Sequence, residues 1–421
     1  MKKTGFILIL TVCCFILSFT ASALYEDGEG IYSECVYMEN LETGRIIFDT
    51  RCDDKVYPAS LTKILTCLVA IEKCEDLNET FEIPSDIFDD VYAQGGAHIS
   101  LKYGEVVTVS DLLHATMIRS ACDTATALAY YVSGSVEAFA EEMNKKAAEI
   151  GATNTHFVNA HGLHDDDHYT TTRDLAIITK YALQNEKFCD IISKWCYTVP
   201  ATNMSDERYF ESTIEIEIPE NPNYYEKVTG VKSGFTDEAG RCLITLSKDD
   251  GESYLLVTLG ANKDGYYNAN MAFTDAVNLH EYCHARFSID NIIEKDSVVT
   301  SVKVENGTVA TVDLTTQSSQ KYLCAVDETK NVTYSLPESV KAPVKAGDEI
   351  GTVTVTVGEH TVTEKLYAAQ DVKAVNNSAI VTDSTFVNVL NILSIIIYAV
   401  SGIVLIVFCI LFFKRKKKAN K

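Results

Sequence analysis

The sequence has few basic residues between its two ends, which argues against nucleic acid as a partner. It contains 36 Lys and Arg against 59 Asp and Glu, and eight of the basic residues lie in positions 1–23 and 414–421. The intervening chain therefore has 28 basic residues and a net charge of −31. Such a surface repels nucleic acids and anionic lipids. Tyrosine is frequent but forms no stripe suited to base stacking.

The sequence also lacks recognisable metal-binding and disulfide motifs. No Cys-x-x-Cys pair occurs, and the ten cysteines between the ends follow no compact framework, so we expect free and mostly buried thiols. His161, His164 and His168 lie around a run of aspartates, but their spacing fits no zinc motif and favours a solvated turn. His280 and His284 are four residues apart with no evident third ligand. We expect no metal and no other cofactor.

Two long hydrophobic runs are present, one near each end of the chain. Residues 1–23 are typical of a secretory signal peptide, although an uncleaved anchor is the alternative. Residues 387–413 contain no charge and exceed the ~20 residues that cross a bilayer core. The basic tail 414–421 follows, and the positive-inside rule places it in the cytoplasm. We predict a single-pass cell-membrane protein, anchored by a C-terminal helix, whose body lies outside the cytoplasm.

The exported body is long enough for two domains. Residues 24–285 alternate between helix-like and strand-like segments. Residues 286–370 are rich in valine and threonine at a period of two, which predicts a small all-β domain. Residues 371–386 form a linker to the membrane helix.

The first domain is predicted to contain helices packed on an antiparallel sheet. The hydrophobic pattern predicts helices over 61–73, 109–120, 124–132, 136–150 and 271–287. A β-hairpin is predicted from the runs 241–247 and 254–260, which flank a polar turn. The fold class is therefore α+β, followed by a β-rich domain.

A serine and a lysine three residues apart open the first apolar helix. Ser60 and Lys63 share one helical face, so their side chains can touch. A serine hydroxyl becomes a good nucleophile when a base removes its proton, and a lysine serves as this base when burial or a second cation lowers its pKa. N–H groups at the helix start could bind an oxyanion. Alone the pair is a weak signal, because a capped helix with a surface lysine gives the same pattern.

Two further motifs strengthen this interpretation. Lys232, Ser233 and Gly234 precede the predicted hairpin, where lysine and hydroxyl can hold a carboxylate and glycine admits a peptide to the strand edge. Ser120 and Cys122 lie between two predicted helices, and a second serine near the base can relay a proton. The motifs follow in order, separated by 60 and 112 residues. Their order makes the combination a much stronger signal than any one of them.

Together the motifs resemble the set shared by class A β-lactamases and penicillin-binding proteins. The chain is similar to the serine D-alanyl-D-alanine carboxypeptidases, the low-molecular-weight penicillin-binding proteins, over roughly residues 30 to 285. Segments 159–163, 168–176 and 230–240 also fit this family, and 343–347 resembles its C-terminal module. The resemblance implies a penicillin-binding/β-lactamase-like transpeptidase fold, a peptidoglycan pentapeptide substrate, and β-lactams as inhibitors.

The resemblance also implies a role for each matched residue. Ser60 is expected to be acylated by the penultimate D-alanine, Lys63 to accept its proton, and Ser120 to pass a proton to the departing D-alanine. The substrate-binding residues are expected to be Lys232, Ser233, Gly234, Phe235 and Cys122. The N–H groups of Ser60 and Phe235 are expected to form the oxyanion hole.

Two positions depart from the family pattern. Ser233 replaces a threonine and keeps the hydroxyl, so this change alters little. Cys122 replaces an asparagine, and a thiol offers only a weak S–H where an amide offers a donor and an acceptor. We expect acylation to be retained with an altered rate or specificity.

Two other functions were weighed against the carboxypeptidase. A β-lactamase-like hydrolase needs a glutamate for fast deacylation, and the sequence offers no convincing one. A catalytically weak wall-binding or scaffold protein is suggested by Cys122 alone. The intact set of Ser60, Lys63, Ser120 and Lys232 argues against it.

Overall fold

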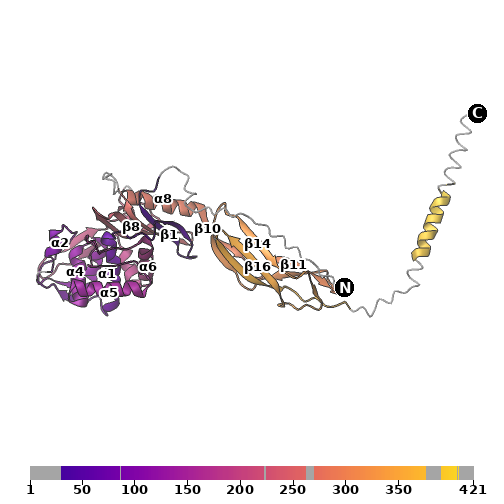
Figure 1. Ribbon diagram of the computed structural model, residues 1–421, viewed down its shortest axis with the longest axis horizontal. Helices are drawn as coiled ribbons and strands as arrows, with labels where there is room; N and C mark the ends of the chain where they lie inside the picture. The colour runs from indigo at the N-terminus through magenta and orange to yellow at the C-terminus, as the bar shows by residue number, and fades with distance from the viewer. Residues whose placement is uncertain are drawn as a thin grey trace, which may run out of the picture. The chain divides into compact units, whose positions relative to one another are not determined.

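The computed structural model describes residues 30–85, 87–221, 224–261, 270–375, 390–404 and 406. The predicted signal peptide, residues 376–386 of the linker and the basic tail lie outside these residues. The chain divides into two compact units, which are coloured by position in the sequence in Figure 1. Unit 1 consists of Met1–Asp290 and Lys321–Glu328, and unit 2 of Asn291–Gln320 and Thr329–Lys421.

Unit 1 is built on a five-stranded antiparallel sheet in the order β2-β1-β9-β8-β7. Its strands are β1 (Cys35–Asn40), β2 (Ile46–Thr50), β7 (Val228–Thr236), β8 (Gly240–Asp249) and β9 (Glu252–Ala261). The predicted β8–β9 hairpin is confirmed, and it turns at Asp250 and Gly251, whose φ values of +44° and +85° fit a type I′ turn. β1 pairs with β9 although 224 positions separate Cys35 from Leu259.

Alternate side chains of the sheet enter two hydrophobic cores on opposite faces. Cys35 and Tyr37 of β1 enter the larger core, whereas Val36 and Met38 enter the core beneath α8 (Met271–Arg286). The larger core packs against α1 (Lys63–Lys73), α3 (Val109–Ile118), α4 (Cys122–Ser133), α5 (Val136–Glu149), α6 (Thr172–Ala182) and α7 (Glu186–Ile192). Figure 1 shows α8 on one side of the strands and α1 and α5 on the other. The predicted fold of helices on an antiparallel sheet is confirmed.

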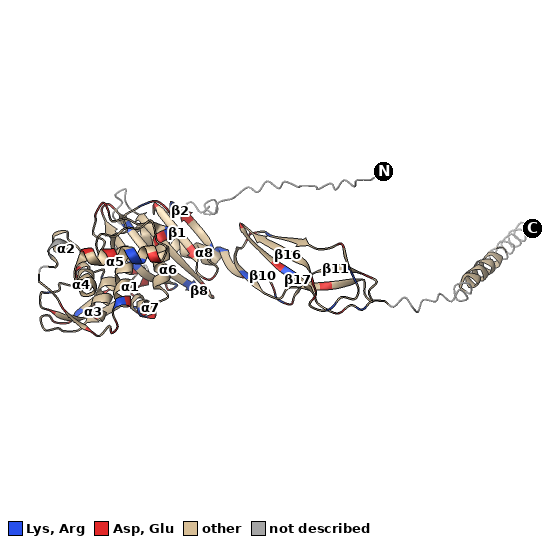
Figure 2. Cartoon of the chain, turned by 60° about the horizontal axis from the view of Figure 1, so that its bottom comes forward, with Lys and Arg blue, Asp and Glu red and all other residues tan. Residues whose placement is uncertain are grey.

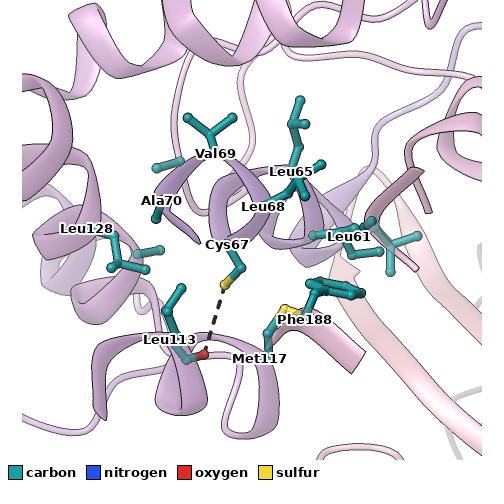
Figure 3. Close-up of a cluster of buried hydrophobic side chains, with 14 of the residues drawn as sticks. Leu61, Leu65, Cys67, Leu68, Val69, Ala70, Leu113, Met117, Leu128 and Phe188 are labelled. Carbon is teal, nitrogen blue, oxygen red and sulfur yellow. Dashed lines mark hydrogen bonds between the residues drawn. The ribbon is translucent and has the colours of Figure 1, made fainter. Parts of the chain in front are cut away.

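Helix α1 lies inside the larger core. Nine of its eleven residues are buried, and a helix that is covered on all sides is stable only when other elements surround it. Figure 3 shows its side chains packed near Leu113 of α3, Leu128 of α4 and Phe188 of α7. Cys67 donates a weak hydrogen bond to the Leu113 carbonyl at 3.9 Å. The predicted apolar helix is confirmed, with a first turn, η2 (Ala59–Thr62), that is a 3₁₀ helix.

Short polar caps set where the outer helices begin. Thr108 and Asp111 form a capping box at α3, and Ser135, Thr171 and Asn185 cap α5, α6 and α7. The remaining short elements of unit 1 are α2 (Asp89–Ala93), β3 (Thr80–Glu82), β4 (Val106–Thr108), β5 (Cys196–Val199), β6 (Arg208–Glu211) and η3 (Glu215–Glu217).

Charged residues lie on the outer elements of unit 1. Figure 2 marks acidic and basic positions close together on α5, where Lys146 pairs with Glu72 at 2.9 Å and with Glu149 at 3.3 Å. Ion pairs near the surface contribute about 0–1 kcal/mol each. The buried apolar contacts therefore hold unit 1 together, and the ion pairs add little.

The described residues of unit 2 before position 376 form a β structure, as predicted. Their six-stranded sheet has the order β14-β16-β17-β12-β11-β15. The strands are β11 (Val298–Glu305), β12 (Thr311–Thr315), β14 (Lys330–Ser335), β15 (Ser339–Lys341), β16 (Glu349–Val357) and β17 (His360–Ala368). The separate pair of β10 (Phe287–Ile293) and β13 (Gln320–Ala325) belongs mainly to unit 1. Val353, Val355 and Val357 of β16 are buried, while Thr354 and Thr356 between them are not. The period of two in the sequence therefore corresponds to one buried and one outward face.

The structure describes ten cysteines, and thiols such as those of Cys67 and Cys283 are free. Eight of these ten are buried, and Cys189 and Cys196 are partly exposed. They act as small apolar side chains in the two cores, Cys67 in α1 being an example.

The predicted membrane helix over 387–413 is described only in part. Residues 390–404 are helical, whereas 387–389, 405 and 407–413 lie outside the described residues. Within the part of the chain that the structure describes, no helix is long and apolar enough to span a bilayer. The prediction is therefore not borne out by these residues.

Candidate active site

The side chains of Ser60 and Lys63 meet at the start of α1. Lys63 Nζ donates a hydrogen bond to Ser60 Oγ at 2.8 Å. Its other bonds go to the His161 carbonyl at 2.6 Å and to Cys122 Sγ at 3.4 Å. Lys63 is fully buried, whereas Ser60 is half-buried and lines a cleft. A hydroxyl that faces a cleft and is backed by a buried amine is the arrangement that a serine nucleophile requires.

The residue before the nucleophile has a left-handed backbone that segment 158–168 supports. Ala59 has φ +48°, and a Cβ at Gly162 would lie 1.8 Å from the Ala59 carbonyl oxygen. Thr62 Oγ1 donates to the same carbonyl at 2.8 Å and accepts from His168 Nε2 at 2.8 Å. The Val158 N–H donates to His168 Nδ1 at 3.1 Å, which places the ring proton on Nε2. This chain of bonds fixes the turn that presents the serine.

Four of the five histidines named above as candidate metal ligands, His161, His168, His280 and His284, make hydrogen bonds through their rings. Burial lowers the pKa of His161 and of His168 to about 3, so both rings are neutral at pH 7. The buried His280 bonds to Thr245 at 2.8 Å and to Ser247 at 2.7 Å. Among the residues described, no three His, Cys, Asp or Glu side chains form a group that could hold a metal ion.

Ser120 and Cys122 lie in the tight turn between α3 and α4. Ser120 has φ +61° and is 7% exposed. The buried Asp123 carboxylate accepts a hydrogen bond from the Ile99 N–H at 3.2 Å, and the Cys122 N–H donates to the Ala97 carbonyl at 2.6 Å. These bonds hold the loop around residue 97 beside the turn, where it forms part of the cleft wall.

The third motif lies on β7, the edge strand that packs against η2. A Cβ at Gly234 would lie 2.8 Å from the Ser60 nitrogen, so glycine is needed for the strand to come this close to the nucleophile. Lys232 is fully buried, and its Nζ donates to the Ser233 carbonyl at 2.9 Å. Burial, followed by the positive charge of Lys63, lowers the pKa of Lys232 to about 7. The charge of Lys232 at neutral pH therefore depends on its neighbours.

All eight predicted site residues lie around one cleft of about 280 Å³. Those that line it are Ser60, Ser120, Cys122, Ser233, Gly234 and Phe235. Lys63 and Lys232 are buried behind this surface. Segments more than 170 residues apart in the sequence therefore form one site.

The sequence analysis missed three polar residues that line the same cleft. Thr213 Oγ1 lies 2.7 Å from Ser233 Oγ, and Asn270 lies at the start of α8. The Arg241 guanidinium lies over the Phe235 ring at 5.2 Å, and the two residues are cross-strand partners. Arg241 is the only charged side chain on the cleft surface within the described residues. Arg241 begins the strand that follows the Lys232–Gly234 motif, so pairing of these two neighbouring segments could have identified it, but no local pattern indicated Thr213.

A nucleophilic serine, a buried lysine and a second serine in one cleft define a serine hydrolase that works by acyl transfer. Residues 25–263 match the D-alanyl-D-alanine carboxypeptidase family, and residues 287–374 match the C-terminal domain of penicillin-binding protein 5. Because the first match covers more than half of the chain, the protein belongs to the D-alanyl-D-alanine carboxypeptidase family. Its activity is that of a serine carboxypeptidase acting on D-alanyl-D-alanine peptides of the cell wall.

Individual relatives agree with this assignment. The D-alanyl-D-alanine carboxypeptidase DacF of Bacillus subtilis is 27% identical over 371 residues, which is 86% of this chain and 92% of the relative. The Streptomyces K15 DD-transpeptidase structure has a TM-score of 0.55 at 26% identity and covers 61% of this chain and 98% of its own. The carboxypeptidase DacD of Francisella tularensis has a TM-score of 0.60 at 20% identity, covering 82% and 95%, and shows the shared fold.

Proposed function

We propose that this chain removes the terminal D-alanine from pentapeptide stems of peptidoglycan through an acyl-enzyme on Ser60. The observation that carries the proposal is the 2.8 Å hydrogen bond from Lys63 Nζ to Ser60 Oγ at the surface of the cleft. The family match supports the substrate class. It also supports β-lactams as inhibitors, because they acylate the same serine.

The reaction follows from the positions of three side chains. Lys63 accepts the proton of Ser60 Oγ as this oxygen attacks the carbonyl carbon of the penultimate D-alanine. The amide bond then breaks, and the proton passes through the Ser120 hydroxyl to the departing amine, so that D-alanine leaves as a neutral amine. Water attacks the ester, Ser60 regains a proton through Lys63, and the shortened peptide is released.

The β7 strand supplies the substrate contacts. The close approach at Gly234 places the strand backbone beside Ser60, so that the N–H groups of Ser60 and Phe235 form the oxyanion hole. Lys232 and Ser233 bind the terminal carboxylate of the substrate, because they combine a positive charge with a hydroxyl.

Cys122 stands where the family usually has an asparagine, whose side chain carries an amide. Its Sγ accepts a hydrogen bond from Lys63 Nζ at 3.4 Å, so the thiol still contacts the base. Solved structures of the Streptomyces K15 enzyme include alanine variants of a serine and of a cysteine two positions apart, the spacing of Ser120 and Cys122. This supports an active enzyme over the wall-binding scaffold that a missing asparagine suggests.

A test of the activity uses the full-length chain in detergent. A fluorescent penicillin is expected to label it stably, and a diacetyl-Lys-D-Ala-D-Ala peptide is expected to lose D-alanine. The Ser60→Ala variant is expected to show neither reaction. Rapid turnover of the penicillin would indicate a β-lactamase instead, and the absence of labelling would contradict both activities.

We also propose that residues 387–413 anchor the protein in the cell membrane with the active site outside the cytoplasm. The helix over 390–404 exposes large apolar side chains, including Ile395 at 65% and Tyr398 at 77%. An exposed apolar surface of this kind requires a partner such as lipid. A variant that ends at residue 386 is expected to leave the membrane fraction, whereas the full chain is expected to remain in it. External protease should cleave the full chain in cells that lack a wall.

A further inference from the structure

Glu217 of η3 lies behind the part of the cleft that Thr213 and Ser233 form. The Gly230 N–H donates to Glu217 Oε2 at 2.7 Å, and the Ser212 hydroxyl donates to Glu217 Oε1. Gly230 lies on β7, two residues before Lys232, and Ser212 is next to Thr213. One carboxylate therefore connects the 212–217 segment to the strand that binds the substrate.

The contact between this segment and β7 is close. A Cβ at position 230 would lie 2.6 Å from Glu217 Oε2 and 2.5 Å from Ile214 Cδ1. Glycine at position 230 is thus what lets the carboxylate reach the strand backbone. No such contact is needed for folding the sheet itself, because β7 already pairs along its length with β8.

The connection determines where two hydroxyl groups lie. Thr213 Oγ1 and Ser233 Oγ are 2.7 Å apart, and both residues line the cleft. Thr213 follows the residue whose hydroxyl Glu217 holds, so the carboxylate sets the position of the Thr213–Ser233 pair. A pair of hydroxyls beside a lysine is suited to a carboxylate ligand.

Glu217 also acts on the charge of Lys232. The charged and titratable groups that act on Lys232 are Lys63, Cys122, Cys67 and Glu217. Burial and the Lys63 charge lower the pKa of Lys232, whereas Cys122, Cys67 and Glu217 raise it, and Glu217 is the only carboxylate among them. Burial raises the pKa of Glu217 itself to about 7, against its hydrogen bonds and the Lys232 charge.

We propose that Glu217 is a positioning residue for recognition of the substrate's terminal carboxylate. It holds the Thr213–Ser233 hydroxyl pair in place, and its negative charge favours the protonated form of Lys232. The inference rests on the proposed function, in which Lys232 and Ser233 bind that carboxylate.

The test compares Glu217→Gln with Glu215→Gln in the full-length enzyme. Gln at 217 keeps the size and the hydrogen-bonding capacity of the side chain but removes its charge. Glu215 is an exposed carboxylate in the same short helix, so its variant controls for a general loss of negative charge. Kinetics are measured on a D-Ala-D-Ala peptide and on an N-acyl-D-alanine thioester whose leaving group has no charge.

Glu217→Gln is expected to raise KM for the peptide about tenfold with kcat changed less than about threefold, the effect of losing one charge-assisted contact. The alkaline limb of the kcat/KM profile is expected to move to lower pH, because Lys232 loses its proton more easily. Thioester turnover and all kinetics of Glu215→Gln are expected to stay within about twofold of wild type.

Equal effects of Glu217→Gln on both substrates, or a pH profile that does not move, would overturn the inference. If the wild-type enzyme cleaves neither substrate, the proposed function fails; if wild type is active and Glu217→Gln matches Glu215→Gln, only the inference fails. Should Glu217→Gln fail to fold by circular dichroism, Ser212→Ala replaces it as the test. Ser212→Ala keeps the charge and breaks the connection, so it is expected to raise KM for the peptide alone without moving the pH profile. Unchanged KM in this variant would contradict the inference as well.

Discussion

The two units differ in what they bury. In the described part of unit 2, Thr316 is the only polar side chain that is buried, and the interior consists of alternating valine and leucine side chains. Unit 1 buries Lys63 and Lys232 completely, together with carboxylates and histidines such as Asp123 and His280. Burying a charged or polar group costs free energy unless partners compensate. The buried polar groups of unit 1 therefore impose a cost on its free energy of folding that unit 2 largely avoids.

This difference indicates that unit 1 carries the catalytic groups and that unit 2 has a structural role. Some of the buried polar groups of unit 1 lie at the cleft, where Lys63 donates to Ser60 Oγ and to the His161 carbonyl. Unit 2 shows only the alternation that a sheet needs to fold. Substitutions in the two units should therefore affect catalysis and stability in different proportions.

The largest effect is expected from replacing the buried base. Lys63→Met keeps the length of the side chain but removes the amine, so acylation by penicillin should slow by about 10²–10⁴-fold, the usual contribution of a general base. Stopped-flow measurement of penicillin labelling tests this. Thermal unfolding serves as the control and should show no loss of stability, because an apolar chain replaces a buried charge. A labelling rate within tenfold of wild type would exclude Lys63 as the base.

Truncation of one core side chain in each unit should sharpen the comparison. Leu68→Ala in α1 is expected to cost about 2–5 kcal/mol of stability and to reduce kcat, because α1 carries Lys63. Val355→Ala in β16 is expected to cost about 2 kcal/mol and to leave kcat and KM unchanged. Urea unfolding followed by circular dichroism gives the stabilities. A loss of kcat in Val355→Ala equal to that in Leu68→Ala would contradict the different roles of the two units.

Acid should destabilise unit 1 before unit 2. Burial lowers the pKa of His161, His168 and His280 to about 3, far below the ordinary value of 6.5. The unfolded chain therefore binds more protons below pH 6.5, and the stability that is present above this pH is lost as the pH falls towards 3. The described part of unit 2 has no buried histidine. Hydrogen exchange between pH 7 and 4 should show faster opening in unit 1 alone.

The His280→Gln variant provides a control for the predicted loss of stability in acid. His280→Gln keeps a hydrogen-bonding side chain between Thr245 and Ser247 but removes one titrating group, so stability should fall less steeply below pH 6.5. An unchanged slope would show that other groups cause the acid sensitivity.

The smallest effect is expected at Cys122. The contact from Lys63 Nζ to Sγ is 3.4 Å long, and an amide oxygen at this place would accept a stronger bond. Cys122→Asn is therefore expected to raise the acylation rate by up to about tenfold, while Cys122→Ala lowers it by a similar factor. The second-order rate constant for penicillin labelling measures both. A thousandfold loss in Cys122→Asn would show that the thiol has a specific role.

Much of the fold and site could be predicted because the signals are local. The three-residue spacing of Ser60 and Lys63 places both on one helical face, and their hydrogen bond follows from it. The period of two in unit 2 similarly follows from the pleat of a strand. The order of the motifs indicated which of these segments belong to one site.

The missed features depend on contacts between distant segments. Pairing of β1 with β9 joins residues 224 positions apart, and no periodicity encodes which strands become neighbours. Thr213 reaches the cleft from a segment that Glu217 connects to β7, and no local pattern encodes this contact. The membrane helix stays a proposal, because residues 387–389, 405 and 407–413 of the predicted span lie outside the described residues.

The packing of Gly162 against Ala59 makes activity dependent on a completely folded unit 1. The reactive turn is held by a segment about 100 residues further along the chain, with no room for even one additional carbon atom. A chain in which segment 158–168 has not yet docked has the serine and the lysine but not their working arrangement. Labelling by penicillin therefore reports the completion of folding, and a newly synthesised chain remains unreactive until that point.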